Sequence, residues 1–304
     1  MSKVKSILKK VFGKMNAAAR RTPWFNEVLF PDCRKFWNHR EIGLEVVNLG
    51  SSSAKYGFDY DGLGLKTANW AMQPQSFVGD LAILENFCSY LKPGAKVIIP
   101  LCPFSSLGGG NDDLADKYYS VIRFISMPHA SLKKRQYIQD LRSYPLKYYP
   151  LYEMLRDFVH LLRRKKEIVV PDFEADADKW IASWMKEFTL YDLHYPLALV
   201  NQDRFNDSVV ALSGLLEFCY SHRYKPVLVL PPMSKHLSSK LDECFRKQFV
   251  YNLVEKANTV DAPFLNYLDE PEFEGDENFR NAYLIGRKGA KRFTKRVLKD
   301  LGMI

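Results

Sequence analysis

The chain has 304 residues, of which 47% are hydrophobic and 26% are charged, and these values suit a globular protein, not a disordered or membrane-spanning one. Its five cysteines are scattered and odd in number, which argues against a disulfide framework or a CxxC metal site. We therefore expect reduced thiols in a cytoplasmic protein that holds no metal and no cofactor.

The net charge of +9 is concentrated at the N-terminus. Residues 1 to 21 carry seven basic side chains and no acidic one, so the other 37 basic and 35 acidic residues leave a net charge of only +2. A basic tail on a nearly neutral body favours a localised contact, whereas a basic body would favour nucleic acid. Since the sequence also has no zinc-finger spacing, we expect no nucleic-acid partner.

A basic amphipathic helix is predicted over residues 4 to 15, where lysines face away from the apolar residues Val4, Ile7, Leu8, Val11, Phe12 and Met15. This run is too short to span a bilayer, and no signal-peptide cleavage site follows it. Residues 1–21 are therefore expected to lie on an anionic membrane surface at the inner face of the membrane, to bind a partner, or to pack against their own domain.

Strand and helix patterns alternate from residue 44 onwards. Apolar runs predict strands at 44–49, 67–72, 96–102, 226–230 and 263–268, and helices at 77–91, near 207–222 and after 286–289. Lys92-Pro93-Gly94 is expected to end the first of these helices. The alternation predicts a flavodoxin-like three-layer α/β/α fold with a parallel sheet, in which residues 1–40 lead into a domain over 41–304.

Residues 114 to 200 break this rhythm. The region is helical in pattern and rich in aromatic residues, and Pro128, Pro145 and Pro150 mark breaks in it. A helical insertion that follows the carboxyl end of a strand is a candidate lid or substrate surface. The aromatic residues can equally form a small core of the insertion itself.

Small polar residues follow the first strand directly, in the order Gly50, Ser51, Ser52 and Ser53. Ligands of open parallel sheets bind outside the carboxyl ends of the strands, where a serine is well placed to be a nucleophile. The alternative is a structural role, because serine also caps the N-terminus of a helix that follows a strand.

Together with three further segments, this turn resembles the SGNH (GDSL-like) hydrolase superfamily, in the branch related to the D-alanine transfer proteins of teichoic acid and to surface-polysaccharide gene clusters. The segments are Asn69-Trp70-Ala71-Met72-Gln73-Pro74-Gln75-Ser76, Gly109-Gly110-Asn111-Asp112 and the terminus from Gly286 to Thr294. The resemblance implies that Ser52 is the nucleophile. It also implies oxyanion or substrate-binding roles for Gly50, Ser51, Asn69 and Asn111.

The sequence departs from the family pattern at three positions. The family places a glycine amide in the oxyanion hole where this chain has Pro74, which has no N–H to donate. Asn281 and Leu284 stand where the family has its Asp and its His base. His236, expected on the same sheet edge as Ser52, is the candidate substitute base, although it can also be an exposed histidine at the start of a helix. Asp59 and Asp80 are expected to be structural.

Two functions follow from these residues. The first is a serine esterase or O-acyltransferase that acts on a cell-surface polysaccharide, or on its acylated precursor, through Ser52. The second is a catalytically inactive SGNH-like protein that binds a glycan or a partner at the membrane surface. The missing Asp and His favour the second function, whereas the intact Gly50-Ser51-Ser52 turn and the aromatic insertion favour the first. We therefore expect an enzyme.

Overall fold

The computed structural model describes residues 2–108, 114–122, 132–151, 153, 155–156, 159, 172–193 and 199–304. It divides into two compact units, of which one comprises Met1–Arg40 with Asp113–Glu167 and the other Glu41–Asp112 with Ile168–Ile304. The predicted break at Pro128 and the predicted site residue Asn111 lie outside the described residues.

The second unit is built on a parallel sheet of five strands in the order β2-β1-β3-β4-β5. The strands are β1 (Leu44–Asn48), β2 (Thr67–Asn69), β3 (Leu91–Pro100), β4 (Lys225–Leu230) and β5 (Phe264–Asn266). This is the flavodoxin-like order, in which the chain reverses direction across the sheet between β1 and β3. The predicted α/β fold is confirmed.

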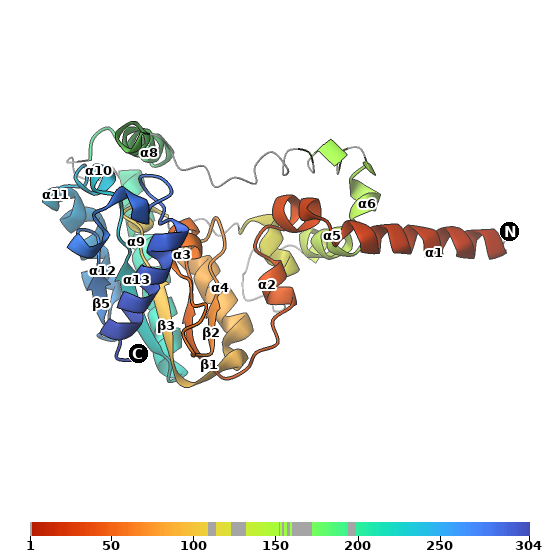
Figure 1. Cartoon of the computed structure of the whole chain (residues 1–304), viewed down its shortest axis with the longest axis horizontal. Helices are drawn as coiled ribbons and strands as arrows, with labels where there is room; N and C mark the ends of the chain where they lie inside the picture. The colour runs from red at the N-terminus through yellow and green to blue at the C-terminus, as the bar shows by residue number, and fades with distance from the viewer. Residues whose placement is uncertain are drawn as a thin grey trace. The chain divides into compact units, whose positions relative to one another are not determined.

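Helices cover the sheet in two layers (Figure 1). α4 (Phe77–Phe87), α9 (Leu199–Ser221) and α12 (Asn252–Ala257) pack together on one side, and α3 (Ser52–Gly57) packs with α13 (Arg287–Asp300) on the other. The connections are α8 (Phe173–Glu187), α10 (Lys235–Ser238), α11 (Glu243–Arg246), and the single turns η2 (Cys88–Tyr90), η3 (Ser105–Leu107), η5 (Lys247–Tyr251), η6 (Pro271–Phe273) and η7 (Asp276–Asn278).

One predicted boundary is wrong. The segment Lys92-Pro93-Gly94 does not end a helix but lies inside β3, because α4 already stops at Phe87 and Leu91 pairs with Leu44 of β1. The register between β1 and β3 shifts after this first pair, and Gly94 has a φ of 75° there. A glycine adopts such an angle at little cost, so the strand continues through a segment whose composition favours a turn.

The first unit is helical. It contains α1 (Ser2–Ala19), α2 (Arg34–Trp37), α5 (Leu132–Ser143), α6 (Pro145–Tyr148), and the shorter turns η1 (Trp24–Leu29) and η4 (Asp116–Ser120). The predicted amphipathic helix is therefore confirmed, and it is longer than its apolar pattern at both ends. The core of this first unit includes Trp24, Phe25 and Phe30, and the Trp37 indole N–H donates to the Ser120 carbonyl at 3.0 Å.

Among the described residues, no helix has both the length and the apolar character needed to cross a membrane.

Candidate functional site

The predicted nucleophile turn lies at the carboxyl end of β1. Gly50 has a φ of 100°, and a Cβ at this position would lie 2.9 Å from the Ala54 Cβ, so both the backbone angle and the space require glycine. Ser51 precedes α3 and makes no capping bond to it; instead, its hydroxyl accepts the Gln75 N–H at 3.3 Å. The cap alternative therefore does not describe Ser51.

The Asp80 carboxylate is hydrogen-bonded to this turn. It lies in α4, is 2% exposed, and accepts the Gly50 N–H at 2.7 Å and a hydrogen bond from the Gln75 side chain. Burial raises the pKa of Asp80 to about 7, against the opposing effect of these two hydrogen bonds. The expectation that Asp80 is structural agrees with these contacts.

Asn69 joins the same turn to α3. Its side-chain N–H groups donate to the carbonyls of Ala54, Lys55 and Phe58 at 3.2–3.3 Å, at the end of that helix. Its carbonyl oxygen accepts from Asn48 and from the Ala71 N–H, each at 3.1 Å. These bonds occupy the amide, so the predicted oxyanion role of Asn69 stays a prediction that its contacts do not favour.

Ser52 begins α3, is partly exposed, and is hydrogen-bonded with the Tyr283 phenol, which also contacts the Cys102 thiol. Burial raises the pKa of the Tyr283 phenol well above its usual 10, the Cys102 thiol adds to this rise, and hydrogen bonds with Ser53 and Ser52 oppose it. Burial also raises the pKa of the Cys102 thiol. The phenol and the thiol are therefore both neutral at physiological pH, and a neutral phenol cannot take a proton from a serine as a general base.

A short hairpin carries Tyr283 to this place. Its two sides meet through an antiparallel bridge between Phe279 and Ile285, and the Arg280 N–H donates to the Leu284 carbonyl at 2.9 Å. At the tip, the Asn281 side chain accepts the N–H groups of Tyr283 and Leu284 at 3.1 and 2.6 Å. Asn281, which stands at the family's Asp position, therefore orders the backbone of the hairpin.

One helix of the predicted insertion, α8, packs on the Tyr283 ring. The indole rings of Trp180 and Trp184 in α8 each lie 5.0 Å from it, and the Asp176 carboxylate of the same helix accepts the Ala282 N–H at 3.0 Å. Trp184 also contacts Phe104, at 4.8 Å between ring centroids, and is 7% exposed. Trp184 therefore forms part of the core, and Trp180 is half-buried beside it.

His236 lies in α10 between two carboxylates. Its Nδ1 is 2.9 Å from Glu174, and its Nε2 is 3.4 Å from Asp276. The hydrogen bond with Glu174 raises the pKa of His236, burial lowers it, and Asp276 raises it further. Both ring nitrogens face acids, so the proposed role of His236 as the base for Ser52 gains no support from these contacts and stays a prediction.

The position of His236 predicts a pH-dependent contribution to stability. Because its pKa is raised in the folded protein, the ion pairs with Glu174 and Asp276 stabilise the fold at low pH, and this contribution is lost as the pH rises through the folded pKa. We expect His236→Gln to be less stable than the wild type at pH 6 and equally stable at pH 9 in urea unfolding. Equal destabilisation at both values would contradict the ion-pair role.

The described residues thus bring together Gly50, Ser51, Ser52 and Asn69, and their roles in a reaction stay predictions. Tyr283 lies beside Ser52, and Cys102 lies beside Tyr283; sequence reasoning missed both. Asn281-Ala282-Tyr283-Leu284 lies at the family's Asp-x-x-His block, which was a signal that this segment reaches the serine turn. Nothing in the sequence indicated that Tyr283, which directly precedes the position of the expected histidine, reaches the serine turn.

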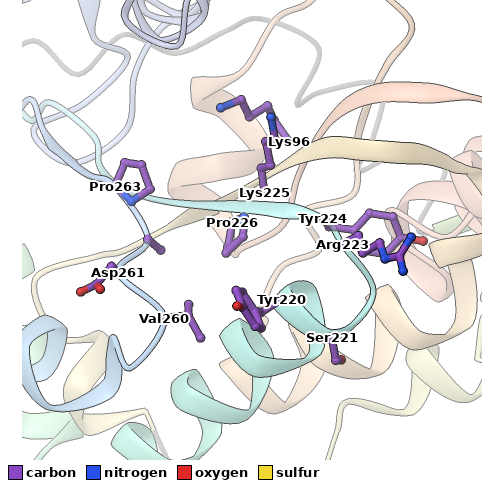
Figure 2. Close-up of a pocket in the computed structure, with 11 residues that line it drawn as sticks. Lys96, Tyr220, Ser221, Arg223, Tyr224, Lys225, Pro226, Val260, Asp261 and Pro263 are labelled. Atoms are coloured by element: carbon purple, nitrogen blue, oxygen red, sulfur yellow. The ribbon is translucent and has the colours of Figure 1, made fainter.

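A pocket of about 690 Å³ lies elsewhere in this unit, at the amino ends of β4 and β5 (Figure 2). Lys96 and Lys225, which are paired in the β3–β4 register, lie at its edge, and Tyr220 of α9 lies near Pro226 on its other side. It includes none of the predicted site residues. Within the described residues, no three or more His, Cys, Asp or Glu side chains are arranged to hold a metal ion.

No family model matches the chain, and no curated protein matches it. Among solved structures it is similar to the psychrotrophic esterase EstA from Pseudoalteromonas sp., inhibited by monoethylphosphonate, with a TM-score of 0.36 and 11% identity over 85% of this chain and 97% of that chain. A likeness at this level decides neither fold nor activity, and both rest on the residues of this chain.

Proposed function

We propose that this chain is an SGNH-like domain that binds a ligand at its serine turn without turning the ligand over. The observation that supports this proposal is the buried, neutral Tyr283 phenol beside Ser52, in the block where the resembling family carries its base. A serine hydroxyl is a weak nucleophile without an adjacent base, and loss of a triad base costs about 10³-fold or more in rate. The ligand class that the resemblance suggests is a cell-surface glycan or its acylated precursor.

Ser52-dependent acyl chemistry is the second candidate, as an esterase or an O-acyltransferase. It is favoured by the Gly50 turn, which Asp80 holds in a conformation that leaves Ser52 partly exposed. In that reaction the Ser52 oxygen attacks the acyl carbonyl, the donor alcohol leaves, and water or a sugar hydroxyl then takes the acyl group. Each half requires a group that accepts and returns the serine proton, and Tyr283 does not supply it.

A fluorophosphonate probe separates the two candidates, because it labels only an activated serine. We expect the wild type to be labelled no faster than Ser52→Ala, and both to hydrolyse p-nitrophenyl acetate at the same rate. The Asn281→Asp/Leu284→His variant restores the family residues. Its labelling rate is compared with that of the wild type, to detect a gain of labelling. Labelling of the wild type that disappears in Ser52→Ala would overturn the non-catalytic proposal and support the acyl-transfer candidate.

Ligand binding is tested separately, with acetylated and unacetylated oligosaccharides as probes in calorimetry. Ser52→Phe, which fills the partly exposed position at the start of α3, should weaken binding of any oligosaccharide that the wild type retains. Gly214→Ala in α9 serves as a control, because a Cβ there meets nothing within 4 Å. Oligosaccharide binding that Ser52→Phe leaves unchanged would place the glycan site elsewhere and contradict the proposal.

A further inference from the structure

The division into two units reveals a separation of charge that the chain order hides. The unit formed by Met1–Arg40 and Asp113–Glu167 contains 22 basic and 8 acidic residues, a net charge of +14. The unit formed by Glu41–Asp112 and Ile168–Ile304 contains 22 basic and 27 acidic residues, a net charge of −5. The basic character therefore belongs to a whole structural unit, and the body of the protein is acidic instead of neutral.

The basic unit exposes an apolar arc along α1. Ile7 and Leu8 are 60% and 62% exposed, and Val11, Phe12 and Met15 are also exposed. At 100° per residue these five side chains fall on one side of the helix, and Lys5, Lys9, Lys10 and Lys14 fall on the rest of its circumference. No ion pair within the described residues involves these four lysines.

A second apolar stripe lies in the same unit. The helical residues Leu151, Leu155 and Val159 are four positions apart, which places them on one helix face, and they are 46–59% exposed. The end of α1 is fixed to this unit, because Asn16 is buried and its side-chain oxygen accepts the Leu146 N–H at 3.0 Å. Both apolar surfaces therefore belong to one compact unit with a strong positive charge.

We propose that this basic unit docks onto an anionic lipid bilayer, with α1 lying in the plane of the interface. Its exposed aliphatic side chains enter the boundary between headgroups and acyl chains, and the lysines around them stay at the level of the anionic headgroups. Nucleic acid fits the charge but not the exposed aliphatic residues, since phosphate contacts come from polar and basic groups. The bilayer satisfies both features at once.

The electrostatic and apolar parts of the contact are separable by mutation. A lysine close to an anionic surface contributes about a fivefold gain in binding, so Lys5→Gln/Lys9→Gln/Lys10→Gln should weaken binding on the order of 100-fold. Ile7→Gln/Leu8→Gln/Phe12→Gln leaves the charge unchanged and should weaken binding at least about tenfold, because the apolar area that leaves water is reduced. All six positions are exposed, and glutamine is a good helix former.

The test is sedimentation of the full chain with vesicles of phosphatidylcholine, with and without about 30% phosphatidylserine. We expect the wild type to pellet only with the anionic vesicles, and less of it to pellet as salt is raised. The matched control is Lys288→Gln/Lys291→Gln/Lys295→Gln in α13, which removes the same charge from exposed positions of the other unit. This control and Ser52→Ala should pellet like the wild type.

Three outcomes would overturn the proposal. Equal pelleting with neutral and anionic vesicles removes the electrostatic part, and equal loss in the α13 control removes the assignment to the basic unit. Tight binding of a DNA or RNA duplex by a wild type that fails to pellet with vesicles assigns the charge to nucleic acid. Circular dichroism of each variant shows whether α1 remains folded, so loss of binding is attributed to the surface only when helicity is unchanged.

Discussion

Asp80→Asn is expected to be more stable than the wild type at pH 8 and equally stable near pH 4. Burial raises the pKa of Asp80 to about 7, whereas an unfolded aspartate titrates near its usual 3.8. Between these values the folded state keeps a proton that the unfolded state releases, so the stability of the wild type falls as pH rises. Asparagine keeps the oxygen that accepts from Gly50 and Gln75 but has no charge to bury.

The difference in unfolding free energy between Asp80→Asn and the wild type should grow across this window. One pKa unit corresponds to about 1.4 kcal/mol, so the difference should reach on the order of 4 kcal/mol at pH 8. Urea unfolding at pH 4, 6 and 8 measures it, with Asp207→Asn on an exposed position of α9 as a control for the loss of one charge. If the variant were less stable than the wild type at pH 8, this result would contradict the argument that burial of the charged Asp80 carboxylate destabilises the folded state.

Gly289→Ala should destabilise the second unit although alanine is the better helix former. A Cβ at this position of α13 would lie 2.2 Å from the Asn278 carbonyl oxygen, which is far inside contact distance and belongs to backbone. The same oxygen accepts the Gly286 N–H at 2.7 Å and closes the base of the hairpin that carries Tyr283. We expect a loss of about 2 to 3 kcal/mol in unfolding free energy, typical of overpacking.

The matched control is Gly214→Ala, which also introduces alanine into a helix. No atom lies within 4 Å of a Cβ at that position, so the substitution should stabilise the protein by about 0.5 to 1 kcal/mol. Opposite signs for the two substitutions would show that close packing, and not helix propensity, fixes glycine at position 289. If Gly289→Ala stabilised the protein, α13 would not be in close contact with the Asn278 backbone at this position.

The charge of the two units shows why charge counted along the sequence led to the interpretation of a nearly neutral body outside residues 1–21. Counting along the sequence assigns +7 to residues 1–21 and +2 to everything else, which describes a tail on a neutral domain. Residues 113–167 are basic too, and they belong to the same unit as the N-terminal segment. Only the contacts between distant parts of the chain define which charges act together.

The sequence by itself determined the parallel sheet, the amphipathic helix, and the serine turn at the end of β1. These follow from hydrophobic periodicity and from the short-range spacing of small polar residues, both of which are local properties. It also determined that the Asp and His of the family are missing, because identity at a position needs no structure.

The surroundings of Ser52 were decided only by the tertiary structure. Asp80 and Tyr283 reach the turn from α4 and from a hairpin more than 200 residues downstream, and the partners of His236 come from α8 and η7. Long-range contacts set burial, and burial sets whether a carboxyl, a phenol or an imidazole carries charge. For that reason a sequence that predicts where a serine stands does not predict whether any neighbouring group can activate it.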